Sequence, residues 1–315
     1  MTESIVIDNT KRKMFKQCKQ KYLLSAIHGW QPDFGSTAIR YGVAWHAIQE
    51  GYHGWIAKNG WPKTPSEQME AITAGLDLGK RKWDKETEEK KFFEDYRNFN
   101  TLVDNFNAYL EFFSTDKDYI KIITTETKFE RPILPENSAE EKILDKLPPL
   151  FFTGRIDLCV EMDYQKWIFD FKTTGWILDK VIAEANRSPQ LIGYSYAGKR
   201  VLNFEPNGCL ASFSFAGSSK SRKTGEYGAP RFEFRRVPQL YTASDIVAWK
   251  LSLIDTAREI DFATKENLFP ESFDNCFQYG ACPYLKLCQQ HLPIEHLNFE
   301  GFHVKPWDVL AEDEV

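Results

Sequence analysis

The stretch FTGRIDLCVEMDYQKWIFDFKTT, Phe152–Thr174, constrains the fold of this 315-residue chain more than any other part of it. Two apolar-rich segments, Phe151–Val160 and Lys166–Phe171, flank the short polar segment Glu161–Gln165. Runs rich in β-branched and aromatic residues on either side of such a segment predict a β-hairpin. We therefore expect the rest of the chain to be organised around these two strands.

The alternation of side chains along these strands places charged groups on one face. Successive side chains of a strand point to opposite faces, so Asp170 and Lys172 are expected to point the same way. The aromatic side chains of that strand are expected to point into a core: Trp167, Phe169 and Phe171. On the first strand, Asp157 lies on the face opposite to Ile156, Leu158 and Val160. A turn of this length can bring Asp157 beside Asp170.

Composition limits the kinds of protein that the chain can be. With 42% hydrophobic and 15% aromatic residues, a globular chain with a sizeable core is expected. The net charge of −5 argues against a protein that coats nucleic acid by bulk charge, so any DNA contact must be local. Basic residues cluster over 11–21 and 220–223, followed by Arg231, Arg235 and Arg236, and these are either solvated faces or phosphate contacts. With no secretory leader and no apolar run of membrane-spanning length, we expect a soluble, cytoplasmic protein without a membrane partner.

Periodicity, capping residues and turn residues predict the order of elements along the chain. Helices are expected over residues 9–30, 37–57, 66–83, 88–113, 189–202 and 243–264. Beside the central hairpin, strands are expected over 118–133, 208–216 and 230–237, and residues 135–149 are expected to form an exposed connection. Helices first, followed by mixed strands and helices, indicate an α/β domain with a helical elaboration at its N-terminal side.

Asp157, Asp170 and Lys172 suit metal-assisted phosphodiester chemistry. A divalent cation held by two carboxylates lowers the pKa of a bound water, and a nearby lysine orients that water or stabilises the transition state. Magnesium prefers oxygen ligands, so the backbone carbonyl of Phe171 is a further candidate ligand. Taken alone, D-x-K is a common tripeptide, and ordinary strand-end carboxylates with a solvated lysine explain it as well.

Four short motifs together resemble the PD-(D/E)XK nucleases of the RecB type, including their CRISPR-associated and AddB-like members. In chain order they are Gly42-Val-Ala-Trp-His46, Gly154-Arg-Ile-Asp157, Asp170-Phe-Lys172 and Gln190-Leu-Ile-Gly-Tyr194. The resemblance extends over most of the chain. It implies a restriction-endonuclease-like mixed β-sheet core flanked by helices.

The resemblance also implies roles for single residues. His46, Asp157 and Asp170 would be metal ligands, and Lys172 the catalytic lysine. Two residues of the expected helix over 189–202 would contact the DNA strand or support the lysine: Gln190 and Tyr194. Glu126, on the strand before the hairpin, corresponds in position to an acidic residue of the family, whereas a strand glutamate is otherwise simply exposed.

Six cysteines divide into two kinds. Cys159 and Cys209 lie in apolar strands and are expected to be small buried residues. One cysteine near the N-terminus and three near the C-terminus resemble the set that holds a 4Fe-4S cluster in the iron–sulfur subgroup of RecB-type nucleases: Cys18, Cys276, Cys282 and Cys288. The subgroup often has two residues between its first C-terminal pair, whereas five stand here. A four-thiolate zinc site and disulfides are the alternatives.

The sequence thus predicts a single nuclease domain over residues 1–315, with a helical elaboration over about 60–115, a core over about 118–240, and a segment 273–290 that closes on residue 18. The resemblance implies a Mg²⁺- or Mn²⁺-dependent deoxyribonuclease, and we expect an exonuclease on single strands in recombination, repair or phage DNA processing. The 5′→3′ polarity is expected by analogy to the iron–sulfur members of the family. The alternatives are an endonuclease that acts with a helicase or recombination protein, and a DNA-binding scaffold that does not cut. No G-x-x-x-x-G-K-[ST] motif is present, so a motor would be a separate chain.

Overall fold

The computed structural model describes residues 4–93, 95–202, 204–278, 280–308 and 310. The chain divides into two compact units: unit 1 holds residues 1–34, 128–155 and 247–315, and unit 2 holds residues 35–127 and 156–246. The expectation of one nuclease domain over the whole chain stays a prediction. Tyr279, which belongs to the cysteine-rich segment 273–290, lies outside the described residues.

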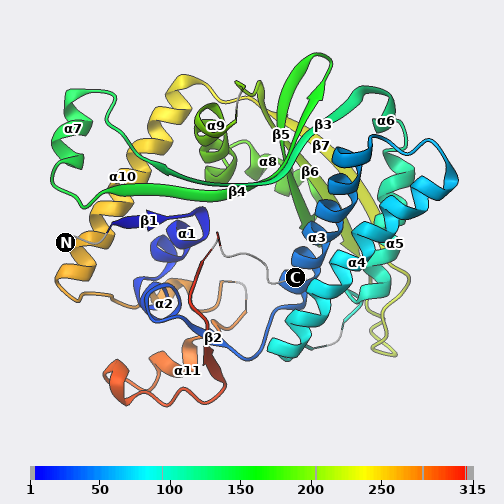
Figure 1. Ribbon diagram of the computed structural model, residues 1–315. Helices are drawn as coiled ribbons and strands as arrows, with labels where there is room; N and C mark the ends of the chain where they lie inside the picture. Colours follow the sequence, from blue (N-terminus) through cyan, green and yellow to red (C-terminus); the bar gives the residue numbers. More distant parts are fainter. Residues whose placement is uncertain (1–3, 94, 203, 279, 309, 311–315) are drawn as a thin grey trace. The chain divides into compact units, whose positions relative to one another are not determined.

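Unit 2 contains helices on both sides of a group of strands (Figure 1). Its helices are α3 (Thr37–Asn59), α4 (Pro65–Glu89), α5 (Phe99–Phe112), α6 (Asp116–Tyr119), α8 (Leu178–Ala185) and α9 (Pro189–Val201). Its strands are β5 (Gln165–Thr174), β6 (Gly208–Gly217) and β7 (Arg231–Gln239), together with the parts of β3 (Ile120–Pro132) and β4 (Leu150–Met162) that belong to this unit.

The strands pair as a mixed sheet. β4 pairs antiparallel with β5, β5 parallel with β6, and β6 antiparallel with β7, while β3 pairs with β4. The predicted central hairpin is confirmed, and its turn is short. Asp163 and Tyr164 have φ values of 51° and 62°, and two consecutive residues with positive φ match the right-handed twist of the flanking strands. This mixed sheet with flanking helices confirms the α/β class.

Each face of β5 is covered by different helices. Trp167, Phe169 and Phe171 join a core with side chains of α3, α4 and α5, among them the fully buried Trp45. The opposite face carries Ile168, against which α9 packs so closely that a Cβ at Gly198 would lie 2.7 Å from Ile168 Cδ1. Asp170 is on this second face, which explains why a charged side chain of a central strand is 0% exposed.

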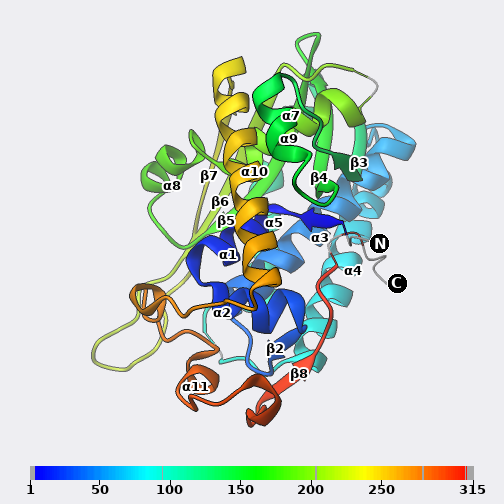
Figure 2. The ribbon, with the colours of Figure 1, turned by 90° about the vertical axis from the view of Figure 1, so that its left-hand side faces the viewer.

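Except for α10, the helices and strands of unit 1 are short. They are β1 (Ile5–Ile7), α1 (Asn9–Gln17), α2 (Lys19–Tyr22), a π-helix (Leu23–Ile27), β2 (Trp30–Pro32), α7 (Ser138–Leu144), a 3-10 helix (Phe273–Asn275), α11 (Leu285–Cys288), a second 3-10 helix (Ile294–His296) and β8 (Phe302–Val304). The helix α10 (Ala243–Lys265) lies mostly in this unit. β1 pairs in parallel with the first part of β4, and β2 lies beside β8 (Figure 2).

Three sequence-based predictions about elements are wrong. The helix expected over 9–30 is interrupted at Cys18, whose φ of −163° and ψ of 116° are extended. The helix expected over 88–113 begins only at Phe99, where the Asn98 side chain caps it by accepting from Thr101 N. The connection over 135–149 contains α7, and its Glu140 is buried because Lys250 of α10 bonds to it at 2.7 Å.

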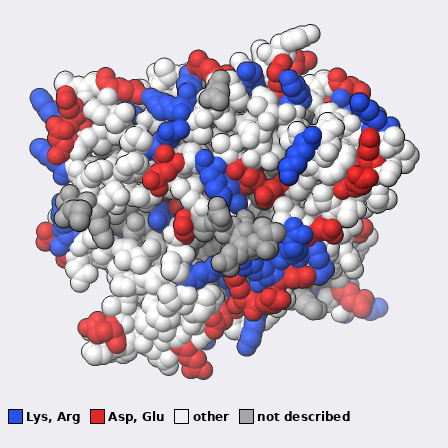
Figure 3. All heavy atoms as spheres, in the orientation of Figure 1, with Lys and Arg blue, Asp and Glu red and all other residues white. Residues whose placement is uncertain are grey.

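Charged side chains of both signs are interspersed on the face of the molecule drawn in Figure 3. This agrees with the small net charge of the chain. Among the described residues, none of the helices combines the length and apolar character needed to cross a bilayer.

Candidate active site

Two neighbouring strands bring Asp157 and Asp170 together in unit 2. The register of β4 and β5 pairs Leu158 with Phe169, one position from each aspartate. The Phe171 backbone N–H donates to Asp157 Oδ2 at 2.8 Å, which fixes that carboxylate against the neighbouring strand. The predicted proximity of the two aspartates therefore agrees with the observed register.

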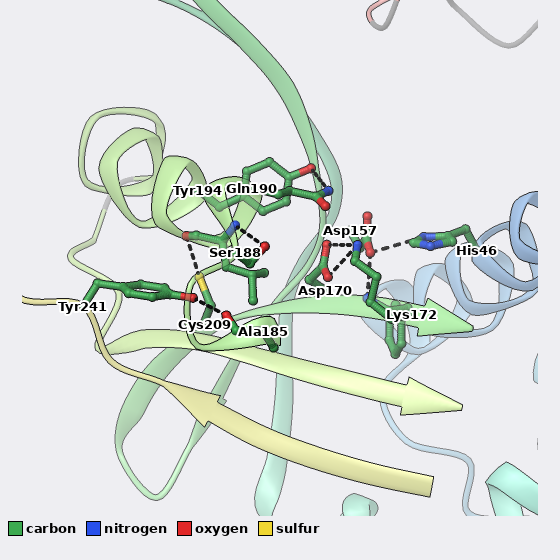
Figure 4. Close-up of polar contacts among 12 residues, drawn as sticks. His46, Asp157, Asp170, Lys172, Ala185, Ser188, Gln190, Tyr194, Cys209 and Tyr241 are labelled. Carbon is green, nitrogen blue, oxygen red and sulfur yellow. Dashed lines mark hydrogen bonds and ion pairs between the residues drawn. The ribbon is translucent and has the colours of Figure 1, made fainter. Parts of the chain in front are cut away.

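Lys172 lies on the same face of β5 as Asp170, as the alternation of the strand predicts. Its Nζ lies 2.8 Å from Asp170 Oδ1 and donates a hydrogen bond to it. The lysine side chain is 35% exposed, whereas the Asp170 side chain is 0% exposed. The lysine thus connects a buried carboxylate to solvent. Figure 4 shows the contact between the two side chains.

His46 reaches the Asp157 carboxylate from α3. Its Nδ1 lies 3.2 Å from Asp157 Oδ2. Four residues earlier, Gly42 faces β5, and a Cβ there would lie 3.2 Å from Thr173 Oγ1. The spacing Gly42-x-x-x-His46 is therefore one helical turn that lets α3 approach β5 closely and then presents the imidazole to Asp157.

The two carboxylates have opposite pKa shifts. Burial raises the pKa of Asp170, and the negative charge of Asp157 acts in the same direction, while Lys172 only partly offsets them. Burial also disfavours ionised Asp157, but the positive charge and hydrogen bond of His46, then the charge of Lys172, hold the pKa of Asp157 below its usual value. Two neighbouring titratable groups whose environments shift their pKa values in opposite directions are typical of a functional site.

The helix α9 places Gln190 and Tyr194 beside the carboxylates (Figure 4). Ser188 caps it by accepting from Leu191 N, and Pro189 is its first residue, as the sequence predicts. Gln190 Nε2 donates to Tyr194 Oη at 2.9 Å. Burial, then the charges of Asp157 and Asp170, raise the pKa of Tyr194 well above its usual value, so the phenol stays neutral and serves as a hydrogen-bonding group.

Glu126 lies on the part of β3 that belongs to the same unit. Its charge is one of those that raise the pKa of Tyr194, which places it in the electrostatic surroundings of the site. Its backbone has a φ of 49°, in the left-handed region that a non-glycine residue seldom adopts. Such strained positions concentrate at functional sites.

One contributor to the site gave no signal in the sequence. Asn105 of α5 is fully buried, and its Nδ2 donates to Tyr41 Oη of α3 at 3.0 Å and to Ser214 Oγ of β6 at 2.9 Å. This network joins the helix that carries His46 to the sheet that carries Asp170. A single asparagine in an amphipathic helix does not reveal from sequence alone that it is buried.

The carboxylates have the chemistry of cation ligands. Asp170 Oδ2 is buried and has no hydrogen bond of good geometry from the described residues, although Lys172 Nζ lies 2.7 Å away. A buried carboxylate oxygen with spare acceptor capacity fits a hard divalent cation. As the side chains stand, no three His, Cys, Asp or Glu residues within the described part of the chain are arranged to hold a metal ion.

The cysteines Cys18, Cys276, Cys282 and Cys288 all belong to unit 1 and are free thiols. Asn275 Nδ2 donates to Gln17 O at 2.8 Å, which brings the segment before Cys276 to the end of α1. Burial, then charges that include those of the other three cysteines, raise the pKa of the Cys288 thiol to about 12. The four thiols are therefore electrostatic neighbours. Cys159 and Cys209 are buried, as predicted.

Comparisons with known proteins found one family model and distant solved structures that are similar to this chain. The family model described as "PD-(D/E)XK nuclease superfamily" matches residues 10–289. No curated protein matches the chain. Among solved structures, the chain is similar to that of SSO0001, with 12% identity over 90% of this chain and 98% of that one and a TM-score of 0.29. It is also similar to a "Putative exonuclease" from Eubacterium rectale, with 12% identity over 83% and 89% and a TM-score of 0.34. Such distant structural similarity carries no information about activity.

Proposed function

The chain belongs to the PD-(D/E)XK nuclease superfamily, and on that premise we propose that it is a divalent-metal-dependent deoxyribonuclease. The observation that carries the proposal is the convergence of Asp157, Asp170 and Lys172 at the junction of β4 and β5. The family match supplies the class of reaction. The hydrogen bonds among these residues support assigning the reaction to this site.

Asp157, Asp170, His46 and the backbone carbonyl of Phe171 are the groups that would hold Mg²⁺ or Mn²⁺. When bound, such a cation lowers the pKa of a water molecule and neutralises negative charge on the phosphate. His46 and the Phe171 N–H hold Asp157 in its ionised form and in one orientation. Asp170 must likewise be ionised, and the Lys172 ammonium is the nearest charge that favours this.

Lys172 is the group that we assign to the attacking water and the phosphate. Lys172 is a partly exposed cation beside a fully buried carboxylate. Its ammonium can therefore give up its hydrogen bond to Asp170 and donate to a phosphate oxygen while the backbone of β5 stays in place. Gln190 and Tyr194 form a neutral hydrogen-bonded pair on the other side of the carboxylates and are assigned to the DNA strand or to the support of Lys172.

We assign the substrate as single-stranded DNA with a free end, degraded exonucleolytically from 5′ to 3′, in recombination, repair or phage DNA processing. A helicase or recombination protein is the partner that such a role implies. Endonucleolytic cutting with a partner, and DNA binding without cutting, are the competing functions. The intact set of two aspartates and a lysine favours cutting.

End-labelled single-stranded DNA tests the activity directly. With Mn²⁺, wild type is expected to shorten the strand, while Asp170→Ala and Lys172→Ala are expected to lose at least about 10²-fold in rate. Lys166→Ala, at the other end of β5, is the matched control. Equal degradation by all variants would refute the assignment. Labels at the 5′ and 3′ ends report polarity, and a circular single strand that is cut would show an endonuclease.

The four cysteines are proposed to hold a 4Fe-4S cluster. Support comes from their division along the chain, one near the N-terminus and three near the C-terminus, which resembles that of the iron–sulfur subgroup, and from the mutual effect of their charges. The thiolates would have to draw closer together on binding. Anaerobically purified protein is expected to be brown and to contain about four iron atoms per chain. Cys18→Ser is expected to lose the colour, and Cys209→Ser to keep it. A colourless protein with one zinc per chain would favour the four-thiolate zinc site.

A further inference from the structure

Exposed aromatic and basic side chains surround the exit of the active-site strand. Four residues after Lys172, Trp176 is 62% exposed. Its backbone N–H donates to Thr174 Oγ1 at 2.9 Å, so the turn after β5 is ordered by the last residue of the strand. Lys180 Nζ lies 4.9 Å from the centre of the indole ring. A large aromatic surface is therefore presented to solvent next to a cation.

The loop of the β6–β7 hairpin begins at the same end of the sheet as the turn after β5. Because β5 and β6 are parallel, Thr174 pairs with Phe215, and β6 ends shortly afterwards at Gly217. The connection over 218–230 extends beyond the ends of β6 and β7 (Figure 2). It carries three exposed basic side chains: Lys220, Arg222 and Lys223.

This hairpin is held in place at its base. Lys220 forms a β-bridge with Tyr227, and its Nζ lies 5.2 Å from the Tyr227 ring centre. Tyr227 in turn contacts the ring of Tyr96 at 5.4 Å. Tyr96 Oη donates to Ala216 O at 2.9 Å, and a Cβ at Gly175 would lie 3.4 Å from the same Oη. The surface is thus continuous from Trp176 to the basic loop.

We propose that these side chains bind a single nucleic-acid strand next to the scissile phosphate. We name Trp176, Tyr96, Tyr227, Lys220, Arg222 and Lys223 the aromatic–basic track. At about 3.3 Å per residue, Thr174 lies about 7 Å beyond Lys172 along β5, about the rise of two stacked nucleotides. Trp176 stacks on an unpaired base, and the basic side chains bind the phosphates that follow. Aromatic platforms alternating with basic side chains are the pattern of single-strand binding sites.

The inference rests on the proposed function, since it assigns a strand to the same site, but its test measures binding. All variants carry Asp170→Ala so that DNA stays intact, and fluorescence anisotropy of labelled dT20 gives the affinity. The triple variant K220Q/R222Q/K223Q is expected to bind at least about tenfold more weakly, because three phosphate contacts on a single strand are removed. The slope of the logarithm of the binding constant against the logarithm of the salt concentration is expected to fall in magnitude by about 2. The matched control K58Q/R81Q/K85Q removes the same charges from α3 and α4 and is expected to bind as the parent does.

Trp176 has its own pair of variants. Trp176→Ala is expected to weaken binding of dT20 by about 5- to 150-fold, the loss of one stacked base, and Trp176→Phe to restore most of it. Tyr164→Ala, which removes an even more exposed aromatic side chain (98%) at the opposite end of β5, is the control. A duplex of equal length offers no free base within its stack, so Trp176→Ala is expected to affect its binding less.

The results separate the two hypotheses. The proposed binding by the track is overturned if both track variants bind dT20 within twofold of the parent, or if the parent binds no dT20. It is also overturned if the control triple variant loses as much affinity as K220Q/R222Q/K223Q, or if Trp176→Ala weakens the binding of duplex and single strand equally. A protein that binds DNA through the track but cuts none in the assay with Mn²⁺ would overturn the proposed function alone.

Discussion

Lys172 Nζ lies 2.8 Å from Asp170 Oδ1, two residues earlier on the same strand. Because the side chains of β5 alternate between faces, this is the shortest spacing at which two residues of one strand can face each other. The pair combines a carboxylate without solvent exposure and a lysine that reaches solvent. Activity and stability should therefore respond in opposite directions when the carboxylate is neutralised.

Asp170→Asn is expected to abolish cleavage and to stabilise the fold at neutral pH. Burial raises the pKa of Asp170, so the folded protein binds this proton more tightly than the unfolded chain. The contribution is complete below the ordinary pKa of 3.8 and is lost as pH rises through the higher folded pKa. At pH 7 the variant should exceed wild type in free energy of unfolding by about 1–3 kcal/mol. Urea unfolding at pH 4 and pH 7 measures this, and a difference that does not grow with pH contradicts it.

His46→Ala is expected to weaken the response to Mn²⁺. The imidazole orients Asp157 and helps to hold its pKa low, so its loss leaves a carboxylate that binds a cation less well. The Mn²⁺ concentration for half-maximal cleavage should rise by at least about tenfold. His28→Ala, which removes an exposed imidazole of unit 1, should leave the Mn²⁺ dependence as it is. An unchanged Mn²⁺ dependence of His46→Ala would remove His46 from the metal site.

Lys250→Met is expected to destabilise the protein by about 3–5 kcal/mol, because Glu140 would remain buried without its cation. The two side chains are 1% and 2% exposed and lie 2.7 Å apart. Burial disfavours ionised Glu140, but hydrogen bonds led by that of Lys250 lower its pKa below 4.5. This stabilisation is present above pH 4.5 and lost as pH falls through the folded pKa. In thermal unfolding, the double variant K250M/E140L should recover most of the loss, whereas an equally unstable double variant would contradict this account.

Gly51→Ala is expected to destabilise the contact between α3 and α4 by about 1–3 kcal/mol, although alanine favours helix formation. Its Cβ would lie 2.4 Å from the backbone oxygen of Ala74, so one helix has to move. Gly54→Ala is the matched control in the same helix, because its Cβ would only approach Thr125 Oγ1 to 4.0 Å. Chemical denaturation should show opposite signs for the two variants, and equal signs would exclude the steric explanation.

The alternation of β5 and the caps of its neighbours explain why much of the site could be predicted. Trp167, Phe169 and Phe171 are buried in one core and Lys172 faces Asp170, because a period of two is a local property of any strand. Ser188 and Pro189 start α9 for equally local reasons. The order of the four motifs indicated the superfamily, and the family match agrees with it.

The break at Cys18 and the burial of Glu140 could not be predicted in the same way. Both depend on residues far away in the chain. Gln17 O, at the end of α1, accepts from Asn275, and the buried Glu140 is paired with Lys250 of α10. A Pro- and Glu-rich segment has the composition of an exposed connection until such a partner is known.

The sequence by itself determined the central hairpin, the shared face of Asp170 and Lys172, the start of α9 and the family, because each depends on spacing along the chain. Tertiary structure alone decided how deeply Asp170 is buried, how closely His46 approaches Asp157, and that Asn105 joins α3 to β6. These features depend on which faces of distant elements meet. The opposite pKa shifts of the two aspartates follow from that packing and from no local pattern.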